Sequence, residues 1–140
     1  MAHPLLQIGL VALGSAFGGV SRWIVDLAIG RWLGTEFPFG TLIINVCGSF
    51  FLGWLLSSLS ESPSNYPTAL IGREELRLAI AVGFLGAFTT FSTFEWESNT
   101  MLREGKGWAA SSYVVGSLAL GLIALRSGIL FSNFLKVCST

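Results

Sequence analysis

The chain has 140 residues, of which 52% are hydrophobic and only 11% are charged, and its mean hydropathy is +0.69. Soluble domains carry about 25% charged residues, so this composition excludes a soluble globule and is typical of a small integral membrane protein. Eight basic and eight acidic residues give a formal net charge of +0, which excludes a nucleic-acid-binding protein, because such proteins need an excess of Lys and Arg.

Four apolar segments have roughly the 20 residues that a membrane-spanning helix needs. No Lys or Arg precedes the first segment, and Arg22 and Asp26 stand where a signal peptide would be cleaved. We therefore interpret this segment as a span and not as a signal peptide. The sequence predicts an all-α membrane protein, with residues 1–140 as a single domain. Its four transmembrane helices are expected at about residues 5–30, 38–60, 76–102 and 108–135, with a polar loop at residues 61–75.

Basic residues near the span ends are divided evenly between the two sides of the predicted membrane topology. One side has Arg73, Arg77 and Lys136, and the other has Arg31, Arg103 and Lys106. Because a Lys/Arg bias sets orientation, this balance predicts dual topology and an antiparallel homodimer. The alternative is a single orientation that a partner fixes. Four helices are too few to enclose a water-filled path, which also favours association.

The first two spans carry polar residues at helical spacing. Arg22 and Asp26 are four residues apart, so they either form an ion pair or leave Arg22 to attract anions at a vestibule. In the second span, Thr41, Asn45 and Gly48 share one stripe. Asn45 either holds the bundle together by hydrogen bonds between helices or offers its amide donors to a passing anion.

The third span contains the most unusual stretch of the chain. Four of the five residues at 89–93 carry hydroxyl groups, and Gly83 and Gly86 lie just upstream. Thr is a poor helix former, and its hydroxyl competes for backbone carbonyls. We predict a break in the helix near residues 86–90, where freed carbonyls could coordinate a cation. The alternative is an intact helix whose hydroxyls bond to the preceding turn.

Two further patterns accompany the predicted break. Phe91 and Phe94 are three residues apart, and the positive edges of their rings could line a path for a small anion. Tyr113, Ser117 and Gly121 form a mildly polar stripe on the last span. Ordinary helix packing is the alternative for both patterns.

The sequence has no constellation that indicates an enzyme, such as a Ser/His/Asp set or a phosphate-binding loop. Cys47 and Cys138 with a single histidine make no zinc site, and we interpret both cysteines as free thiols. An ion channel is the preferred function. The alternatives are a small proton-coupled multidrug exporter of dual topology, with Asp26 as its carboxylate, and a structural assembly subunit.

Nearly the whole chain resembles the Fluc (CrcB) family of fluoride channels. The resemblance rests on Arg22, on residues 40–50 (GTLIINVCGSF) and above all on residues 83–95 (GFLGAFTTFSTFE). It implies an antiparallel dual-topology homodimer in the bacterial inner membrane. Two pores per dimer would export fluoride passively from the cytoplasm.

The resemblance also implies roles for single residues. Asn45 would be the pore asparagine, and Phe91 and Phe94 would contact fluoride through their ring edges. Backbone carbonyls of Gly86 and Thr89 would hold a structural sodium ion at the dimer centre. Arg22 would be the vestibule arginine, and Glu97 matches a glutamate near a pore end. The remaining expected pore residues are Thr41, Thr93, Ser117 and Tyr113, and Gly121 falls where some members have a serine.

Overall fold

The computed structural model describes residues 4–60 and 72–138, and all regular structure in these two ranges is helical. The first two spans are α1 (Pro4–Leu33) and α2 (Phe39–Ser60), and the last is α6 (Gly107–Val137). The third span consists of α3 (Arg73–Leu76), the π-helix η1 (Arg77–Leu85), α4 (Gly86–Phe88) and α5 (Phe91–Arg103). Four long apolar helices with an interrupted third are thus confirmed. The single-domain organisation stays a prediction. Residues 61–71 of the predicted polar loop lie outside the described residues, and its last three residues, 73–75, are not loop but belong to α3.

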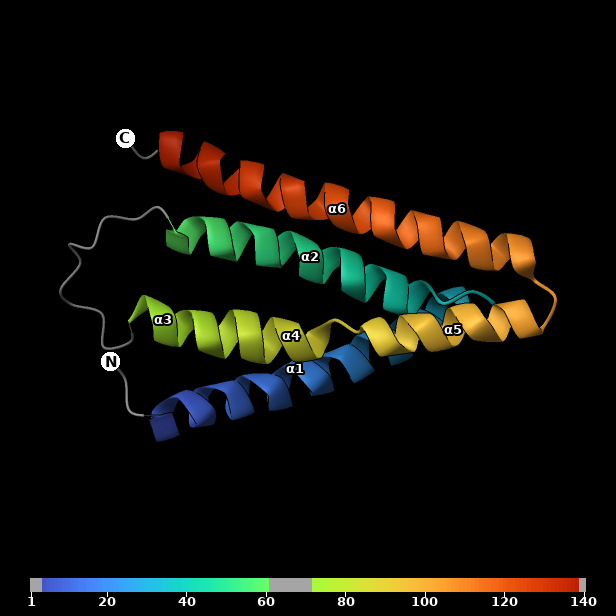
Figure 1. Ribbon diagram of the computed structural model, residues 1–140, viewed down its shortest axis with the longest axis horizontal. Coiled ribbons are helices and arrows are strands. Elements are labelled where there is room, and N and C mark those ends of the chain that lie inside the picture. The colour runs from blue at the N-terminus through green and yellow to red at the C-terminus, as the bar shows by residue number, and fades with distance from the viewer. Residues whose placement is uncertain (1–3, 61–71, 139–140) are drawn as a thin grey trace.

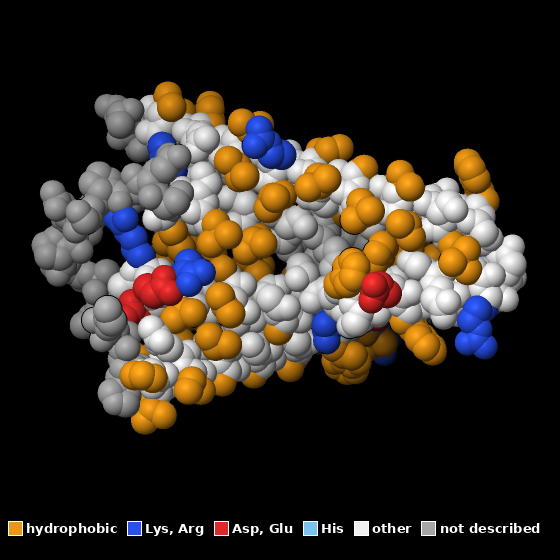
Figure 2. Space-filling view, viewed as in Figure 1, with side chains coloured by type: hydrophobic (Ala, Val, Ile, Leu, Met, Phe, Trp, Pro, Cys, Tyr) orange, Lys and Arg blue, Asp and Glu red, His pale blue; other side chains and the backbone are white. Residues whose placement is uncertain are grey.

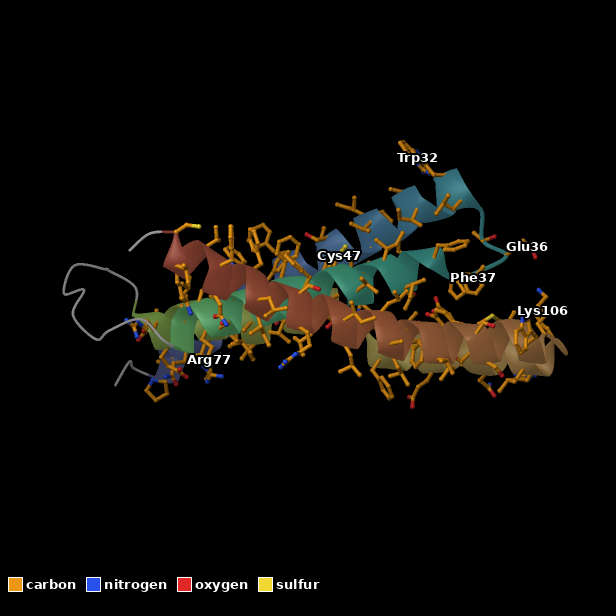
Figure 3. The ribbon with its side chains drawn as sticks, turned by 90° about the horizontal axis from the view of Figure 1, so that it is seen from above. Trp32, Glu36, Phe37, Cys47, Arg77 and Lys106 are labelled. Atoms are coloured by element: carbon orange, nitrogen blue, oxygen red, sulfur yellow. The ribbon has the colours of Figure 1, made fainter. Side chains whose placement is uncertain are left out.

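The spans lie side by side, with α2 between α6 and the third span (Figure 1). The most extensive contacts are between α2 and α6 and between α1 and η1. In the view of Figure 1, α6 runs in the opposite direction to α5 and to the rest of the third span. The end of α1 diverges from the other helices, and Trp32 projects away from them (Figure 3).

The third span is interrupted where the sequence predicts it. Thr89 (φ −78°, ψ 158°) and Thr90 (φ −149°, ψ 120°) are extended, and α5 begins at Phe91. The Thr89 hydroxyl donates to the carbonyl of Leu85 at 3.0 Å. The hydroxyl of Thr90 accepts from the backbone N–H of Thr93 at 3.3 Å and caps the new helix. The helix break is confirmed, and the intact-helix alternative is wrong.

Glycines bring the backbones of neighbouring helices into contact. A Cβ at Gly18 would meet the carbonyl oxygen of Phe84, and a Cβ at Gly14 would meet that of Ala79. Gly128 of α6 lies in the same way against the carbonyl of Phe50 in α2. Small residues permit such close approach in membranes, where helix association depends on packing. Gly14 and Gly18 therefore determine how closely α1 packs against the third span.

Gly18→Val is expected to destabilise the fold by about 1–3 kcal/mol, because the new side chain overlaps backbone that cannot rotate away. The matched control is Gly19→Val, since a Cβ at Gly19 meets nothing within 4 Å. Thermal unfolding of the purified protein in detergent measures both. Equal unfolding temperatures for the two variants would contradict the close α1–η1 contact.

The surface of the described residues is apolar over most of its length. Hydrophobic side chains are spread over the whole face in Figure 2, while charged side chains gather mainly at the left end and a few lie along the middle. Glu36 and Lys106 lie at one end of the molecule and Arg77 at the other (Figure 3). Cys47 and Cys138 are free thiols on exposed positions. All four spans are long and apolar enough to cross a bilayer, so the protein is a multi-pass membrane protein.

Candidate functional site

Asn45 joins α2 to the break in the third span. Its Nδ2 donates to the carbonyl of Thr90 at 3.1 Å, and its Oδ1 accepts from the backbone N–H of Thr90 at 2.9 Å. One amide thus satisfies both backbone groups of an extended residue, which would otherwise be costly to bury in a membrane. The hydrogen bond between helices is confirmed for Asn45. An amide nitrogen carries two hydrogens, so the second remains a donor for a ligand.

A groove of about 250 Å³ lies beside this junction, between α2, α5 and α6. It brings together four of the predicted pore residues, namely Asn45, Phe91, Phe94 and Ser117. The rings of Phe91 and Phe94 are 5.8 Å apart between centroids and inclined by 39°. Phe91 is 66% exposed whereas Phe94 is only 8% exposed, so the groove has one open wall and one packed wall.

The hydroxyl of Ser117 is the unpaired polar group of this groove. Its Oγ is buried and has no hydrogen-bond partner among the described residues. Buried polar groups are nearly always hydrogen-bonded, and exceptions call for an explanation. Ser117 lines the groove, and its unpaired hydroxyl is the candidate donor to an anion bound there.

Thr41 and Tyr113 do not line the groove, and their hydroxyl groups bind the Glu97 carboxylate instead. The Thr41 hydroxyl donates to one oxygen of Glu97 at 2.8 Å, and the Tyr113 hydroxyl donates to the other at 2.7 Å. Both donors are buried, at 2% and 1% exposure. The ring of Tyr113 packs on Phe94 with centroids 5.1 Å apart. Phe94 and Tyr113 therefore connect the groove to Glu97.

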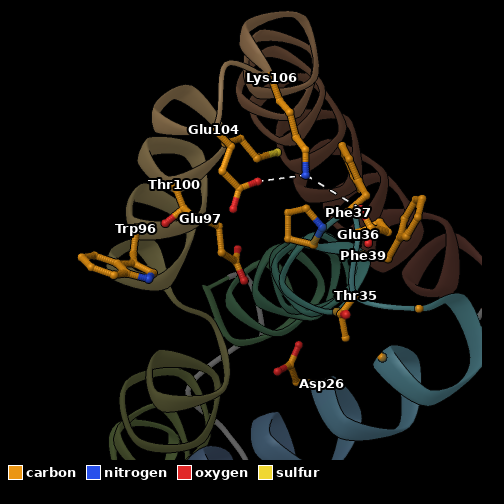
Figure 4. Close-up of a pocket in the computed structure, with 15 residues that line it drawn as sticks. Asp26, Thr35, Glu36, Phe37, Phe39, Trp96, Glu97, Thr100, Glu104 and Lys106 are labelled. Carbon is orange, nitrogen blue, oxygen red and sulfur yellow. Dashed lines mark ion pairs between the residues drawn. The ribbon is translucent and has the colours of Figure 1, made fainter.

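Glu97 faces a second cavity of about 390 Å³ at the end of the molecule (Figure 4). Lys106 lies in its wall and pairs with Glu104 at 2.9 Å and more loosely with Glu36 at 3.8 Å. The hydrogen bond and charge of Glu104 raise the pKa of Lys106 above its usual value, so this ammonium stays charged. Asp26 lines the α1 side of the same cavity.

Comparison with known proteins places this arrangement in a family. The model of the family described as CrcB-like protein, Camphor Resistance (CrcB), matches residues 9–129. The chain belongs to the CrcB family.

Relatives of this CrcB chain carry the name fluoride-specific ion channel FluC. One from Solibacter usitatus is 40% identical over 124 residues, which are 89% of this chain and 96% of that protein. One from Acidobacterium capsulatum is 42% identical over 88% of this chain and 93% of its own length. One from Chlorobaculum tepidum is 44% identical over 89% of this chain and 92% of its own length.

The predicted ion pair in the first span of this CrcB chain is wrong. Arg22 and Asp26 make no ion pair with each other in the described ranges. The carboxylate of Asp26 instead lies where a Cβ of Gly40 would be. Helical spacing brings two residues to one face, but the contact with α2 directs Asp26 elsewhere. Arg22 is half-buried and lines neither the groove nor the end cavity, and its vestibule role stays a prediction.

The break also leaves two carbonyl groups without their helical donors. The N–H of Thr90, which would bond to Gly86 in a continuous helix, goes to Asn45. The N–H of Thr93, which would bond to Thr89, goes to the Thr90 hydroxyl. Carbonyl oxygens suit a hard cation. The backbone at Gly86 and Thr89 therefore fits the predicted sodium site, and the sodium itself stays a prediction.

The positions of three residues differ from, or go beyond, what the sequence predicts. Thr93 is exposed and accepts a hydrogen bond from the Thr90 hydroxyl at 2.9 Å, and it does not line the groove. Ser49 lines the groove with Gly121 and is not among the predicted pore residues, although it lies one helical turn after Asn45. Only the family resemblance points to Glu97 in the sequence. Its position three residues after Phe94 was the signal that it lies near the same face.

Proposed function

We propose that this CrcB protein is a fluoride-selective passive ion channel. The observation that carries the proposal is the groove, where a buried and unpaired Ser117 hydroxyl, the Asn45 amide and two phenyl rings converge. The names of the relatives support the same ion. We propose that the direction of net flow is export from the cytoplasm, because fluoride accumulates there when HF enters and dissociates.

The chemistry of the groove suits an ion that holds its water tightly. Replacing that water requires several donors, each weak enough to release the ion again. Hydroxyl and amide hydrogens and the positive edges of phenyl rings meet this requirement. A cationic side chain in the same place would bind fluoride too strongly for rapid passage. Among the described residues, none of those that line the groove is basic.

The working unit in this proposal is an antiparallel homodimer with two pores. The even distribution of basic residues supports both orientations in the membrane. The groove is open on the side of Phe91, so one protomer alone does not enclose an ion. A second copy that covers this side would complete the pathway.

A structural sodium ion at the dimer centre is part of the same proposal. The freed carbonyls of Gly86 and Thr89 support it, because two such groups from each protomer would give four oxygen ligands. Gly86 and Thr89 also line one surface groove of about 240 Å³. The sodium ion would hold the two helix breaks together.

The test is an efflux assay with purified protein in liposomes. Liposomes loaded with potassium fluoride should release fluoride rapidly once a potassium ionophore supplies the counter-current. Liposomes loaded with chloride should release far less. The same vesicles with a proton gradient and a lipophilic cation test the exporter alternative. Fluoride release no faster than from protein-free liposomes would refute the proposal.

Phe94→Ile should slow fluoride efflux about tenfold, because it removes the positive ring edge from the groove wall and a loss of about 1.4 kcal/mol is about tenfold in rate. The matched control is Phe131→Ile, since Phe131 also packs on a ring, 6.0 Å from Phe50 between centroids, but outside the groove. Equal efflux rates for the two variants would show that the Phe94 ring does not act on the ion.

A further inference from the structure

Two charges of opposite sign stand on the apolar flank of the protein without a partner. Glu95 of α5 and Arg126 of α6 are both exposed. Neither makes an ion pair or hydrogen bond within the described residues. Both lie within helices that span the membrane, where an isolated charge is costly and usually finds a partner.

Both charges border the groove described above. Glu95 is one helical turn beyond Phe91, and Arg126 is one turn beyond Leu122, and both of these apolar residues line the groove. Residues four apart lie on one face of a helix. Glu95 and Arg126 therefore extend the same open flank, one at each end.

Glu95 and Arg126 lie at equal distances from the level of the helix break, measured along the helices. Gly121 of α6 is level with the break, because a Cβ there lies 3.7 Å from the Ser49 hydroxyl and the neighbouring Gly48 abuts the Thr89 side chain. From Gly121 to Arg126 is five residues, or about 7.5 Å along α6. From the end of the break at Thr90 to Glu95 is also five residues, or about 7.5 Å along α5.

These two displacements point in opposite directions, since α5 and α6 run antiparallel (Figure 1). Glu95 and Arg126 of one chain are thus about 15 Å apart in height, too far to pair with each other. A two-fold axis at the level of the break and parallel to the membrane exchanges the two heights. It would bring Glu95 of one chain level with Arg126 of a second copy.

We propose that Glu95 and Arg126 form two symmetric ion pairs between the protomers of the antiparallel dimer. The inference rests on the dimer of the proposed function and names the side chains that hold it in register. Such an interface is isologous, since each surface contacts its own copy. Each pair also neutralises a carboxylate one turn from Phe91, where a free negative charge would repel an anion.

Exchanging the charges of Glu95 and Arg126 tests the proposed ion pairs. The parent protein, Glu95→Arg, Arg126→Glu and the combined exchange are labelled with fluorophores and reconstituted in vesicles at decreasing protein density. Each single change should lower the dimer association constant about tenfold or more, as close charge pairs at interfaces do. The combined exchange should restore the constant to within about threefold of the parent, because each pair is rebuilt with reversed polarity.

Arg103→Glu is the matched control, because Arg103 is an exposed basic residue at the far end of α5 and away from the groove. It should leave the constant unchanged. Losses that add up in the combined exchange, or single variants that behave like Arg103→Glu, would overturn the inference. A monomeric parent would overturn both the pairs and the dimer. A parent that dimerises but releases no fluoride would refute only the channel, and the pairs would stand.

Discussion

Asn45→Asp is expected to lower fluoride efflux by at least about 100-fold. The carboxylate keeps an acceptor for the N–H of Thr90 but loses the donor to the Thr90 carbonyl. It also sets a negative charge beside the groove. Two charges about 5 Å apart repel by about 3 kcal/mol at an effective dielectric constant of about 20, and each 1.4 kcal/mol is about tenfold in rate.

The measurement is the liposome efflux assay at neutral pH, with helix content followed by circular dichroism. The matched control is Asn133→Asp, because Asn133 also uses its Oδ1, which accepts from the Ser57 hydroxyl at 3.2 Å outside the groove. That variant should conduct like the parent. Parent-like efflux from Asn45→Asp would mean that the amide does not face the ion.

Ser117→Ala should slow fluoride efflux by about 10- to 100-fold, since a hydrogen bond to a charged group contributes about 1.5–3 kcal/mol. The hydroxyl has no protein partner among the described residues, so its removal should not weaken the fold. Slow efflux with an unchanged unfolding temperature is thus the expected signature.

Two further variants separate the effect of the hydroxyl donor from the effect of side-chain volume. Ser117→Thr restores the hydroxyl and should recover most of the efflux. Ser112→Ala removes a hydroxyl from an exposed position on α6 outside the groove and should have no effect. If Ser117→Ala conducts as fast as Ser112→Ala, the unpaired hydroxyl is not part of the pathway.

Much of the architecture follows from local properties of the sequence. Apolar runs predict the four spans, and the density of Thr after Gly86 predicts the break, because both effects act within one or two turns of the chain. The groove was partly predictable for the same reason. Asn45, Ser117 and the two phenylalanines lie on regular stripes, and these stripes do meet.

What the sequence could not supply depends on contacts between distant segments. Spacing put Asn45 on a face but could not show that its amide would hold Thr90, 45 residues away. It suggested an ion pair for Asp26, whose position against Gly40 depends on how α1 meets α2. The π-helix at Arg77–Leu85 has no pattern of its own in the sequence.

The helix that starts at Phe91 has an electrostatic effect that needs no charged side chain. The first backbone N–H groups of any helix lack partners within it, and their aligned dipoles place about half a positive charge at that end. Because the chain restarts a helix of 13 residues at Phe91, in the middle of the third span, this positive pole lies deep in the membrane beside the groove. Such a potential is built from peptide groups alone, so it does not titrate. A pathway that relies on it keeps its preference for anions as the acidity on either side of the membrane changes.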